Sequence, residues 1–431
     1  MSLSATASLP SGMSIIRARV YSDEKGAPLW EQFLVTVWLF ITYVQLPGTS
    51  ALLYLMVIVM LGIMFMDKET VLPVAFRSWP LFLIPIWGMM SVLWSPFPAL
   101  AFRAGVLMFL SPLMMVIMLA RMDVRHVLRC LMFAGWICAF VVLPYIGDLT
   151  TGGPFSSKNY LGMQMNFMML ISFATLLNKR ELLWIRIATV PFIGLGVTFV
   201  ALSNSVTSQV FAVVGPVGIL LTKLFWAETA RIRNLRGFIL GAFIIIVLSI
   251  TMLILSMPNV DIVGEFLDKI GKSGSYHDRE RIWVAGKVIV HQHPILGVGL
   301  EGFWYSANGA AQSINFYDHK PFGTKLSFHN SYLEMRVHLG IVGLLLYEFL
   351  WCWIVFRLVK SWLSSPHLEF SLLVVTTILI FTFSHTESMP AGIFNTAVNL
   401  LYIGSVATLG GSAKRLVGHI PITVRETDSR R

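Results

Sequence analysis

Residues 258–338 form a long polar stretch in an otherwise apolar chain, and they hold six of its ten histidines. Ser331 and Glu334 have the spacing of a capping box, which predicts that a helix starts here. The unpaired N–H groups of a helix start attract an anion, and its positive dipole end favours a neutral imidazole. We interpret His329 as a candidate general base and Asn330 as part of the anion site. The alternative is a histidine that hydrogen-bonds locally.

Residues 278–291 (DRERIWVAGKVIVH) predict a short helix with Arg279, Trp283 and Lys287 on one face. Arginine binds a phosphate through two parallel N–H groups, which lysine cannot do. Arg279 is therefore a candidate phosphate ligand. Arg281 is the weaker candidate, because it points about 200° away around the helix. The alternative is solvated charge on an amphipathic helix.

Smaller polar groups lie beside apolar stretches, where an ionisable residue is a functional hypothesis by default. They comprise Lys158 with Asn159, the Ser203–Thr207 segment with Ser205, and the Ser384–Ser388 segment with Glu387. We interpret Glu387 as an alternative base or as the residue that orients the acceptor. A helix cap or a charge that reaches out to the interface is the alternative in each case.

Metal and nucleotide sites are not predicted. His291 and His293 lack a cysteine or carboxylate at a defined spacing, and the chain has no Asp-x-Asp, so we expect no metal and no cofactor. Gly297–Gly302 has the form GxGxxG, but no strand is expected before it, which favours a simple glycine turn. The turn leads to Phe303–Tyr305, which we interpret as a membrane-interface anchor or a sugar-stacking platform.

The elements that must position these residues are membrane helices. The chain is 56% hydrophobic and 13% charged, whereas soluble proteins are about 25% charged. A helix needs roughly 20 apolar residues to cross a bilayer. The sequence therefore predicts an all-α polytopic fold of about twelve transmembrane helices. The expected spans are 33–47, 51–66, 81–94, 104–120, 130–147, 160–177, 183–202, 208–226, 237–257, 340–356, 369–386 and 391–411.

Basic residues orient these spans. With both termini inside, the inner segments hold 22 of the 32 Lys and Arg residues, and apart from the long loop the outer side holds two. The predicted organisation is a cytoplasmic tail (1–32), nine helices (33–257), a large outer loop with short helices (258–338), three helices (339–411) and a cytoplasmic tail (412–431). The net charge of +10 suits anionic lipid, so we expect membrane lipid and no nucleic acid as partners.

Short motifs follow one another around the expected outer loop. They are Trp94-Ser95-Pro96, Lys158-Asn159-Tyr160-Leu161-Gly162, Arg279 with Trp283, His293-Pro294-Ile295-Leu296-Gly297-Val298-Gly299, His329-Asn330-Ser331-Tyr332-Leu333-Glu334 and Glu387-Ser388. In this order they resemble the O-antigen ligase and polymerase superfamily of bacterial inner-membrane glycosyltransferases. Within it, the chain looks most like the ExoQ-type exopolysaccharide polymerases.

The resemblance implies that a large periplasmic loop covers the site, and that a glycan passes from an undecaprenyl-diphosphate carrier to an acceptor hydroxyl without a metal. It also implies that Arg279 binds the diphosphate and that His329 is essential. Members often carry Arg or Lys between Ser205 and Thr207, where this chain has Val206. Lys158, Arg281 and Arg336 are candidates to replace that charge.

Several functions remain open at this point. The motifs do not separate a polymerase from a ligase that acts on a lipid A core, because the two differ in the acceptor. A transporter or flippase of lipid-linked oligosaccharide needs charges or broken helices within the spans, and such charges are nearly absent. A structural partner of an export complex is a further alternative. A chain-length regulator and export proteins are candidate partners.

Overall fold

The computed structural model describes residues 27–44, 48–229, 234–235, 237–238, 241, 273–364, 367–388 and 394–409. Within these residues the chain is helical and contains no strand, which confirms the all-α prediction. The expected span 237–257 falls almost wholly outside them, and residues 1–26, 258–272 and 410–431 lie outside them entirely.

The first part of the bundle runs to residue 121 and consists of helices that pack mainly on α5. α4 and α3 contact α5 along much of their length, and α1 packs against α6 instead. These elements are α1 (Leu29–Tyr43), α2 (Ser50–Met66), α3 (Lys68–Arg77), η1 (Trp79–Phe82), α4 (Leu83–Met90), η2 (Ser91–Leu93) and α5 (Pro98–Arg121).

In the second part, α6, α8, α9 and α15 surround α7, which is the most deeply buried of the long helices. α8 packs along α7, and α9 and α15 pack against each other. The elements are α6 (Val124–Val142), η3 (Leu143–Tyr145), α7 (Lys158–Leu177), α8 (Leu183–Leu202), α9 (Val206–Thr229), α14 (Ser331–Ser364), α15 (Leu368–Phe383) and α16 (Thr396–Ala407).

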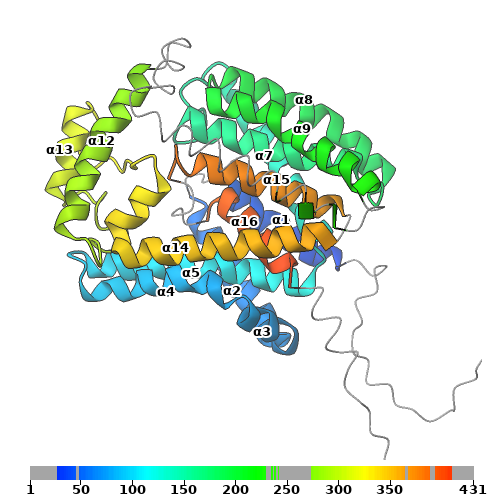
Figure 1. The fold of residues 1–431 in the computed structure, drawn as a ribbon, viewed down its shortest axis with the longest axis horizontal. Helices are drawn as coiled ribbons and strands as arrows, with labels where there is room; N and C mark the ends of the chain where they lie inside the picture. The colour runs from blue at the N-terminus through cyan, green and yellow to red at the C-terminus, as the bar shows by residue number, and fades with distance from the viewer. Residues whose placement is uncertain are drawn as a thin grey trace, which may run out of the picture.

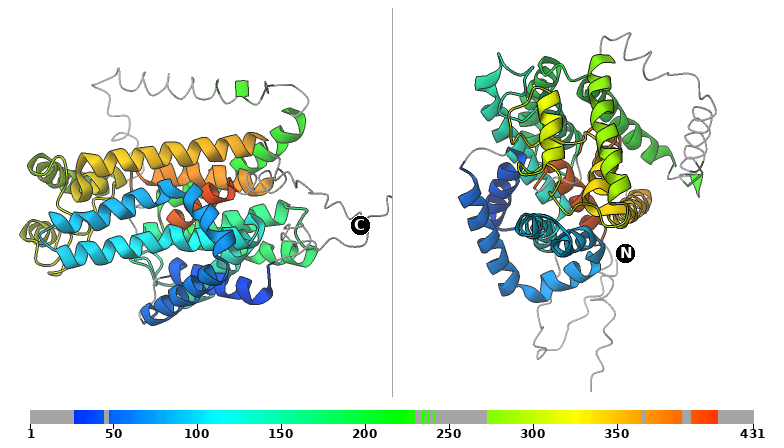
Figure 2. Two further views of the ribbon diagram at one scale, coloured as in Figure 1. Left: turned by 90° about the horizontal axis from the view of Figure 1, so that it is seen from below. Right: turned by 90° about the vertical axis from the view of Figure 1, so that its left-hand side faces the viewer.

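Residues 273–330, which we call the cap, lie at one end of this bundle. They contain α12 (Ser273–Gln292) and α13 (Gly309–Tyr317), and α12 packs on α14. Figure 1 shows α12 and α13 beside the beginning of α14, and the right-hand view of Figure 2 shows them standing across the bundle end. The cap has a small core of its own, in which Phe303, Trp304 and Phe328 are buried. Phe303 and Trp304 are therefore neither an interface anchor nor a sugar platform, because cap packing encloses both rings.

Membrane-crossing length separates the helices into two groups. Six described helices are long and apolar enough to cross a bilayer, and the α2–α3 pair, bent by 104°, makes a seventh if it counts as one span. Each expected span other than 237–257 overlaps described helical residues, but α1, the η1–α4–η2 stretch, α15 and α16 are shorter. A helix of 15 residues, like α1, rises roughly 22 Å against a hydrocarbon core of roughly 30 Å. The described residues thus confirm a multi-pass helical membrane protein, and the count of twelve stays a prediction.

The outer faces of α8 and α9 fit a lipid environment. Ile187 is 60% exposed and Val213 is 66% exposed, and both helices show apolar side chains along the face that points away from the bundle. Hydrocarbon tails solvate such side chains, whereas water would not.

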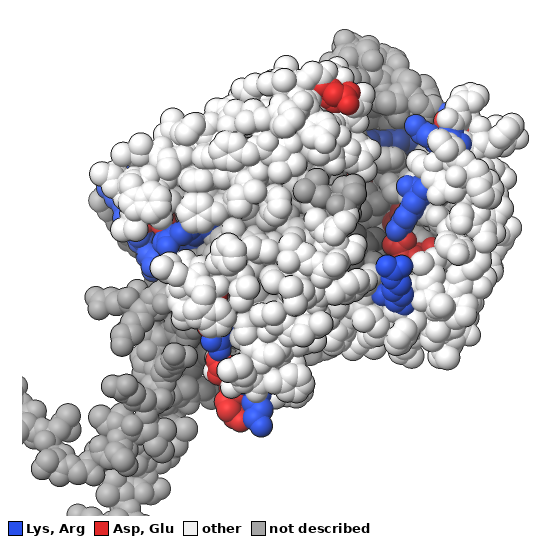
Figure 3. All heavy atoms as spheres, turned by 180° about the vertical axis from the view of Figure 1, so that it is seen from behind, with Lys and Arg blue, Asp and Glu red and all other residues white. Residues whose placement is uncertain are grey.

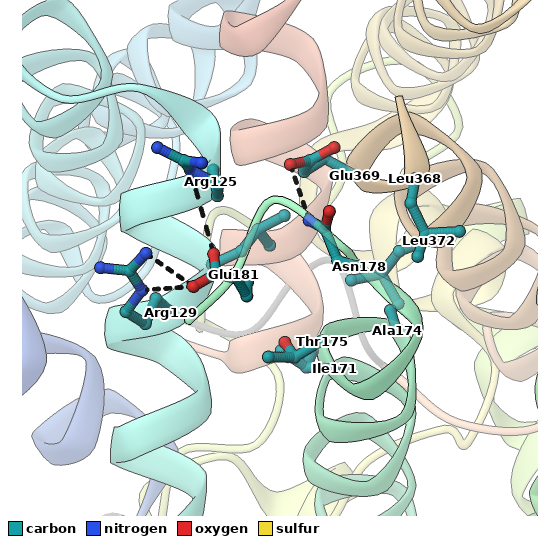
Figure 4. A pocket seen from close by; sticks show the side chains of 11 residues that line it. Arg125, Arg129, Ile171, Ala174, Thr175, Asn178, Glu181, Leu368, Glu369 and Leu372 are labelled. Carbon is teal, nitrogen blue, oxygen red and sulfur yellow. Dashed lines mark hydrogen bonds and ion pairs between the residues drawn. The ribbon is translucent and has the colours of Figure 1, made fainter. Parts of the chain in front are cut away.

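Charged residues at the bundle end away from the cap neutralise one another. Arg129 on α6 donates through Nη2 to Glu181 Oε2 at 2.6 Å, and Asn178 Nδ2 donates to Glu369 Oε1 at 3.0 Å. With Arg125 they line a pocket between α6, α7 and α15 (Figure 4). Buried charges destabilise a fold unless they are paired, so these contacts hold the three helices together.

A break in α14 seats the cap on the bundle. Gly340 has φ 67° and ψ −164°, which interrupts the helix. Residues 294–300 of the cap pack into the break, and Ile341 N donates to Pro294 O at 3.0 Å. A Cβ at Gly340 would overlap the carbonyl oxygen of Ile295. Glycine is required here both by the positive φ and by the close approach of the cap backbone.

We therefore expect Gly340→Ala to lower the apparent Tm of the purified protein by about 2 °C or more, from a loss of about 2 kcal/mol or more. Thermal unfolding in detergent measures this. Gly62→Ala on α2 is the matched control, because its Cβ would meet no atom within 4 Å, and it should leave the Tm unchanged. Equal Tm values for the two variants would show that the break in α14 does not hold the cap on the bundle.

Candidate functional site

The Glu387 carboxylate is the centre of the candidate site. Its Oε1 accepts hydrogen bonds from Asn159 Nδ2 at 2.8 Å and from Arg279 Nη2 at 2.9 Å. Its Oε2 lies 2.8 Å from His329 Nδ1. The side chain is buried, while those of His329 and Arg279 are 31% and 24% exposed. One carboxylate thus gathers an amide, a guanidinium and an imidazole that come from three separate segments.

Local structure positions each partner. Asn159 stands in the first turn of α7, which Ser157 caps by accepting from Tyr160 N at 3.2 Å. Arg279 lies on α12, one turn before Trp283, whose Nε1 donates to the Phe328 carbonyl at 2.8 Å. The expected shared face of Arg279 and Trp283 is therefore confirmed. The hydrogen bond of Trp283 ties α12 to Phe328, the residue that precedes His329.

The start of α14 is as expected, but its cap is not. Asn330 Oδ1 accepts from Tyr332 N at 3.0 Å and from Leu333 N at 3.1 Å, so Asn330 caps the helix. Ser331 instead donates through Oγ to the Glu387 carbonyl at 2.8 Å. The capping box of Ser331 with Glu334 was wrong by one position, because the Asn330 amide reaches the free N–H groups first. The hydroxyl that the pattern assigned to the helix holds the Glu387 backbone.

His329 is arranged as a base with a fixed ring orientation. An ionised carboxylate only accepts hydrogen bonds, so the hydrogen in its contact with Glu387 sits on Nδ1. In the neutral ring Nε2 is then the acceptor. The backbone of His329 has φ 49°, an uncommon conformation for a residue other than glycine. Such strain persists where surrounding contacts hold it, and it is found often at functional sites.

Glu387 is held in its ionised form. Burial works to raise the pKa of its carboxyl, but the hydrogen bond from His329 and the charges of His329 and Arg279 outweigh burial, with a further contribution from Asn159. The pKa lies below its ordinary value as a result. The carboxylate stays charged at neutral pH and can stabilise a proton on His329.

Other sequence candidates lie apart from Glu387. Arg281 Nη2 faces Asp318 Oδ1 at 3.4 Å on the exposed side of α12. Arg336 is exposed on α14, and Ser205 is buried where its Oγ donates to Ser208 Oγ at 3.1 Å. Lys158 adjoins Asn159 and makes no hydrogen bond or ion pair with the described residues. Substrate roles for these four residues stay predictions.

The surface around the site is charged in a largely uncharged molecule. Figure 3 shows Lys and Arg side chains beside acidic ones in a hollow on the cap side of the molecule. His291 and His293 are exposed at the end of α12, and among the described residues no three His, Cys, Asp or Glu side chains are grouped as a metal site. The sequence carried no signal that Asn159 and Glu387, 228 residues apart, would share a hydrogen bond.

Comparisons with known proteins point to the same family as the sequence motifs. A family model described as O-antigen ligase matches residues 191–347. The exopolysaccharide production protein ExoQ of Rhizobium meliloti (strain 1021) is 24% identical over 278 residues, which cover 62% of this chain and 62% of ExoQ. Both findings support the resemblance of this chain to the O-antigen ligase and ExoQ-type family. The chain therefore matches less than two thirds of the length of this curated relative. The region that the family model matches includes Arg279 and His329 but neither Asn159 nor Glu387.

The lowered pKa of Glu387 predicts a pH-dependent contribution to stability. A carboxyl with a depressed folded-state pKa stabilises the fold above its unfolded value, 4.5, and the contribution is lost as the pH falls through the folded value. We expect Glu387→Gln to lower the Tm at pH 7, and the gap from wild type to shrink below about pH 4.5.

Thermal unfolding between pH 7 and pH 3.5 measures that gap. Glu69→Gln, on an exposed side chain of α3, is the matched control and should show no gap at any pH. A gap that stays constant across the range would mean that Glu387 is not held as a carboxylate.

Proposed function

We propose that this protein is a glycan polymerase of the bacterial inner membrane. It transfers oligosaccharide repeats from an undecaprenyl-diphosphate carrier to the hydroxyl of an acceptor sugar, in exopolysaccharide biosynthesis. The observation that carries this proposal is that one buried carboxylate holds both a histidine base and an arginine. The site lies where the apolar bundle meets the cap, and we propose that the diphosphate of the lipid carrier binds at this boundary.

The proposed reaction forms one bond and breaks one. The acceptor oxygen attacks the anomeric carbon, and the bond from that carbon to the diphosphate oxygen breaks. His329 Nε2 takes the hydroxyl proton, a role usually worth about 10²–10⁴ in rate. Glu387 orients the ring and stabilises the imidazolium that forms. The proton later leaves to solvent or to the diphosphate.

Arg279 stabilises the leaving group. A guanidinium has five N–H donors in a planar fork, and the contact with Glu387 uses one of them. A different edge is suited to a phosphate, where it meets negative charge as the bond breaks. In this mechanism Arg279 and His329 supply the charge and the proton transfer without a metal. Lys158, which directly precedes Asn159, is our candidate to add charge in place of Val206.

A ligase that transfers the glycan to a lipid A core is the second candidate, because the matched family model is described as O-antigen ligase. It would use the same donor and the same residues with a different acceptor. In both cases the cap and the site face the periplasm, and both termini lie in the cytoplasm. Chain-length regulators and export proteins are the proposed protein partners of the polymerase.

We expect His329→Ala to bind the lipid-linked donor and to make roughly 10²-fold less polymer, because the base is lost while the phosphate ligand stays. An in vitro assay with purified protein and lipid-linked repeat units measures both quantities. His291→Ala, an exposed histidine on α12, is the matched control and should be fully active. Full activity of His329→Ala would overturn the mechanism, and loss of wild-type activity in EDTA would overturn its independence from metal.

Arg279→Lys should lower activity at least about tenfold, because an ammonium keeps the charge but loses the planar fork. The same assay, with the amount of protein in the membrane measured alongside, tests this. Arg103→Lys on an exposed position of α5 is the control and should behave like wild type. Normal polymer from both Arg279→Lys and Arg279→Ala would reduce Arg279 to a surface residue.

A further inference from the structure

A second buried carboxylate lies behind the candidate site. Glu334, on the first turn of α14, is 5% exposed, and each of its oxygens meets two donors. Oε1 accepts from Trp304 Nε1 at 2.9 Å and faces His338 Nε2 at 3.1 Å. Oε2 accepts from Phe328 N at 2.9 Å and from Ser388 Oγ at 2.9 Å. The carboxylate therefore joins the cap, α14 and the segment after α15.

The two donors on Oε2 are neighbours of the proposed reacting groups. Phe328 directly precedes His329, and Ser388 directly follows Glu387. The carbonyl of Phe328 is also fixed, because it accepts from Trp283 Nε1. Both backbone groups of the residue before His329 are thus held. The positive φ of His329 depends on a neighbour held in this way.

The surroundings give Glu334 a charged partner and exclude water. His338 has acceptors at both ring nitrogens, the Gly299 carbonyl at Nδ1 and Glu334 at Nε2, so a doubly protonated ring satisfies both. The rings of Trp304 and Phe328 pack at a tilt of 51° with centroids 4.8 Å apart, and both are buried. The donors around Glu334 together stabilise the enclosed charge.

We propose that Glu334 is a positioning residue, which sets the distance between His329 and Glu387 by holding the segments next to both. This inference rests on the proposed function. Glu334 does not touch the reacting atoms, so it acts through Phe328 and Ser388. Its loss lowers turnover more than donor binding, because Arg279 is held by Glu387 and α12 and not by Glu334.

The donor arrangement makes Glu334→Gln a sharp variant. The amide of glutamine has one acceptor atom, its oxygen, and one donor group, its NH₂. In either orientation the NH₂ group faces an N–H donor that is fixed in direction and cannot act as an acceptor. With the NH₂ group at the Oε1 position, the conflict is with Trp304 Nε1–H. With it at the Oε2 position, the conflict is with Phe328 N–H. Ser388 and a neutral His338 can accept from the NH₂ group, but these two donors cannot.

The same reasoning predicts a rescue. In the double variant Glu334→Gln with Trp304→Phe, the NH₂ group takes the Oε1 position and donates to neutral His338. The amide oxygen still accepts from Phe328 N and Ser388 Oγ. We expect Glu334→Gln to lower kcat about tenfold or more with the donor KM within about twofold, and the double variant to regain most of kcat. Trp304→Phe alone and the exposed control Glu69→Gln should stay within about threefold of wild type.

Hydrogen exchange at the Phe328 amide tests the positioning independently of activity. The amide should exchange faster in Glu334→Gln than in wild type, and the double variant should restore its protection. Unchanged exchange in Glu334→Gln, or a double variant no better than the single one in either measurement, would overturn the inference. If wild-type protein makes no polymer, the proposed function fails, and the exchange data still decide whether Glu334 holds this segment.

Discussion

The structure depends on how an ionised carboxylate is accommodated where an apolar bundle meets its cap. A buried charge without partners is costly, and Glu387 avoids that cost only by drawing donors from α7, α12 and the segment before α14. Each of these donors lies on an element that local hydrogen bonds hold in place. These bonds are the Ser157 cap of α7, the contact of Trp283 with the Phe328 carbonyl and the Asn330 cap of α14. The site is therefore a consequence of local helix chemistry directed at one group.

The same demand explains why the cap is closely packed. Oxygens in a low-dielectric setting need their hydrogen bonds, and the break at Gly340 exposes backbone groups that the turn before Leu300 and the Trp87 side chain satisfy. Glycine at the break allows that approach. The cap thus supplies hydrogen bonds to the bundle as much as the bundle supports the cap, and the aromatic core of Phe303, Trp304 and Phe328 keeps water away from both.

The sequence predicted many of the helices and site residues but not the tertiary contacts that join them. Local rules gave α12 and the start of α14 because spacing and turn chemistry act within a few residues, and they picked out Arg279, His329 and Glu387. They misassigned the cap of α14, because Asn330 and Ser331 both suit that position and only tertiary contacts choose between them. The sequence favoured exposed positions for Phe303 and Trp304, because a glycine turn before aromatic residues does not show which other side chains pack around them. The count of twelve crossing helices stays a prediction, because hydropathy finds apolar helices without fixing their length.

The position of Glu387 along the chain has a consequence for synthesis. Asn159, Arg279 and His329 all leave the ribosome before it, so the group that gathers them is the last of the four to be made. Until then His329 has no Glu387 to hold its ring, and Arg279 lacks the Glu387 counter-charge. A chain in mid-translation cannot assemble this arrangement. The four side chains come together only in a late step, when the turn after α15 brings Glu387 into contact with the other three.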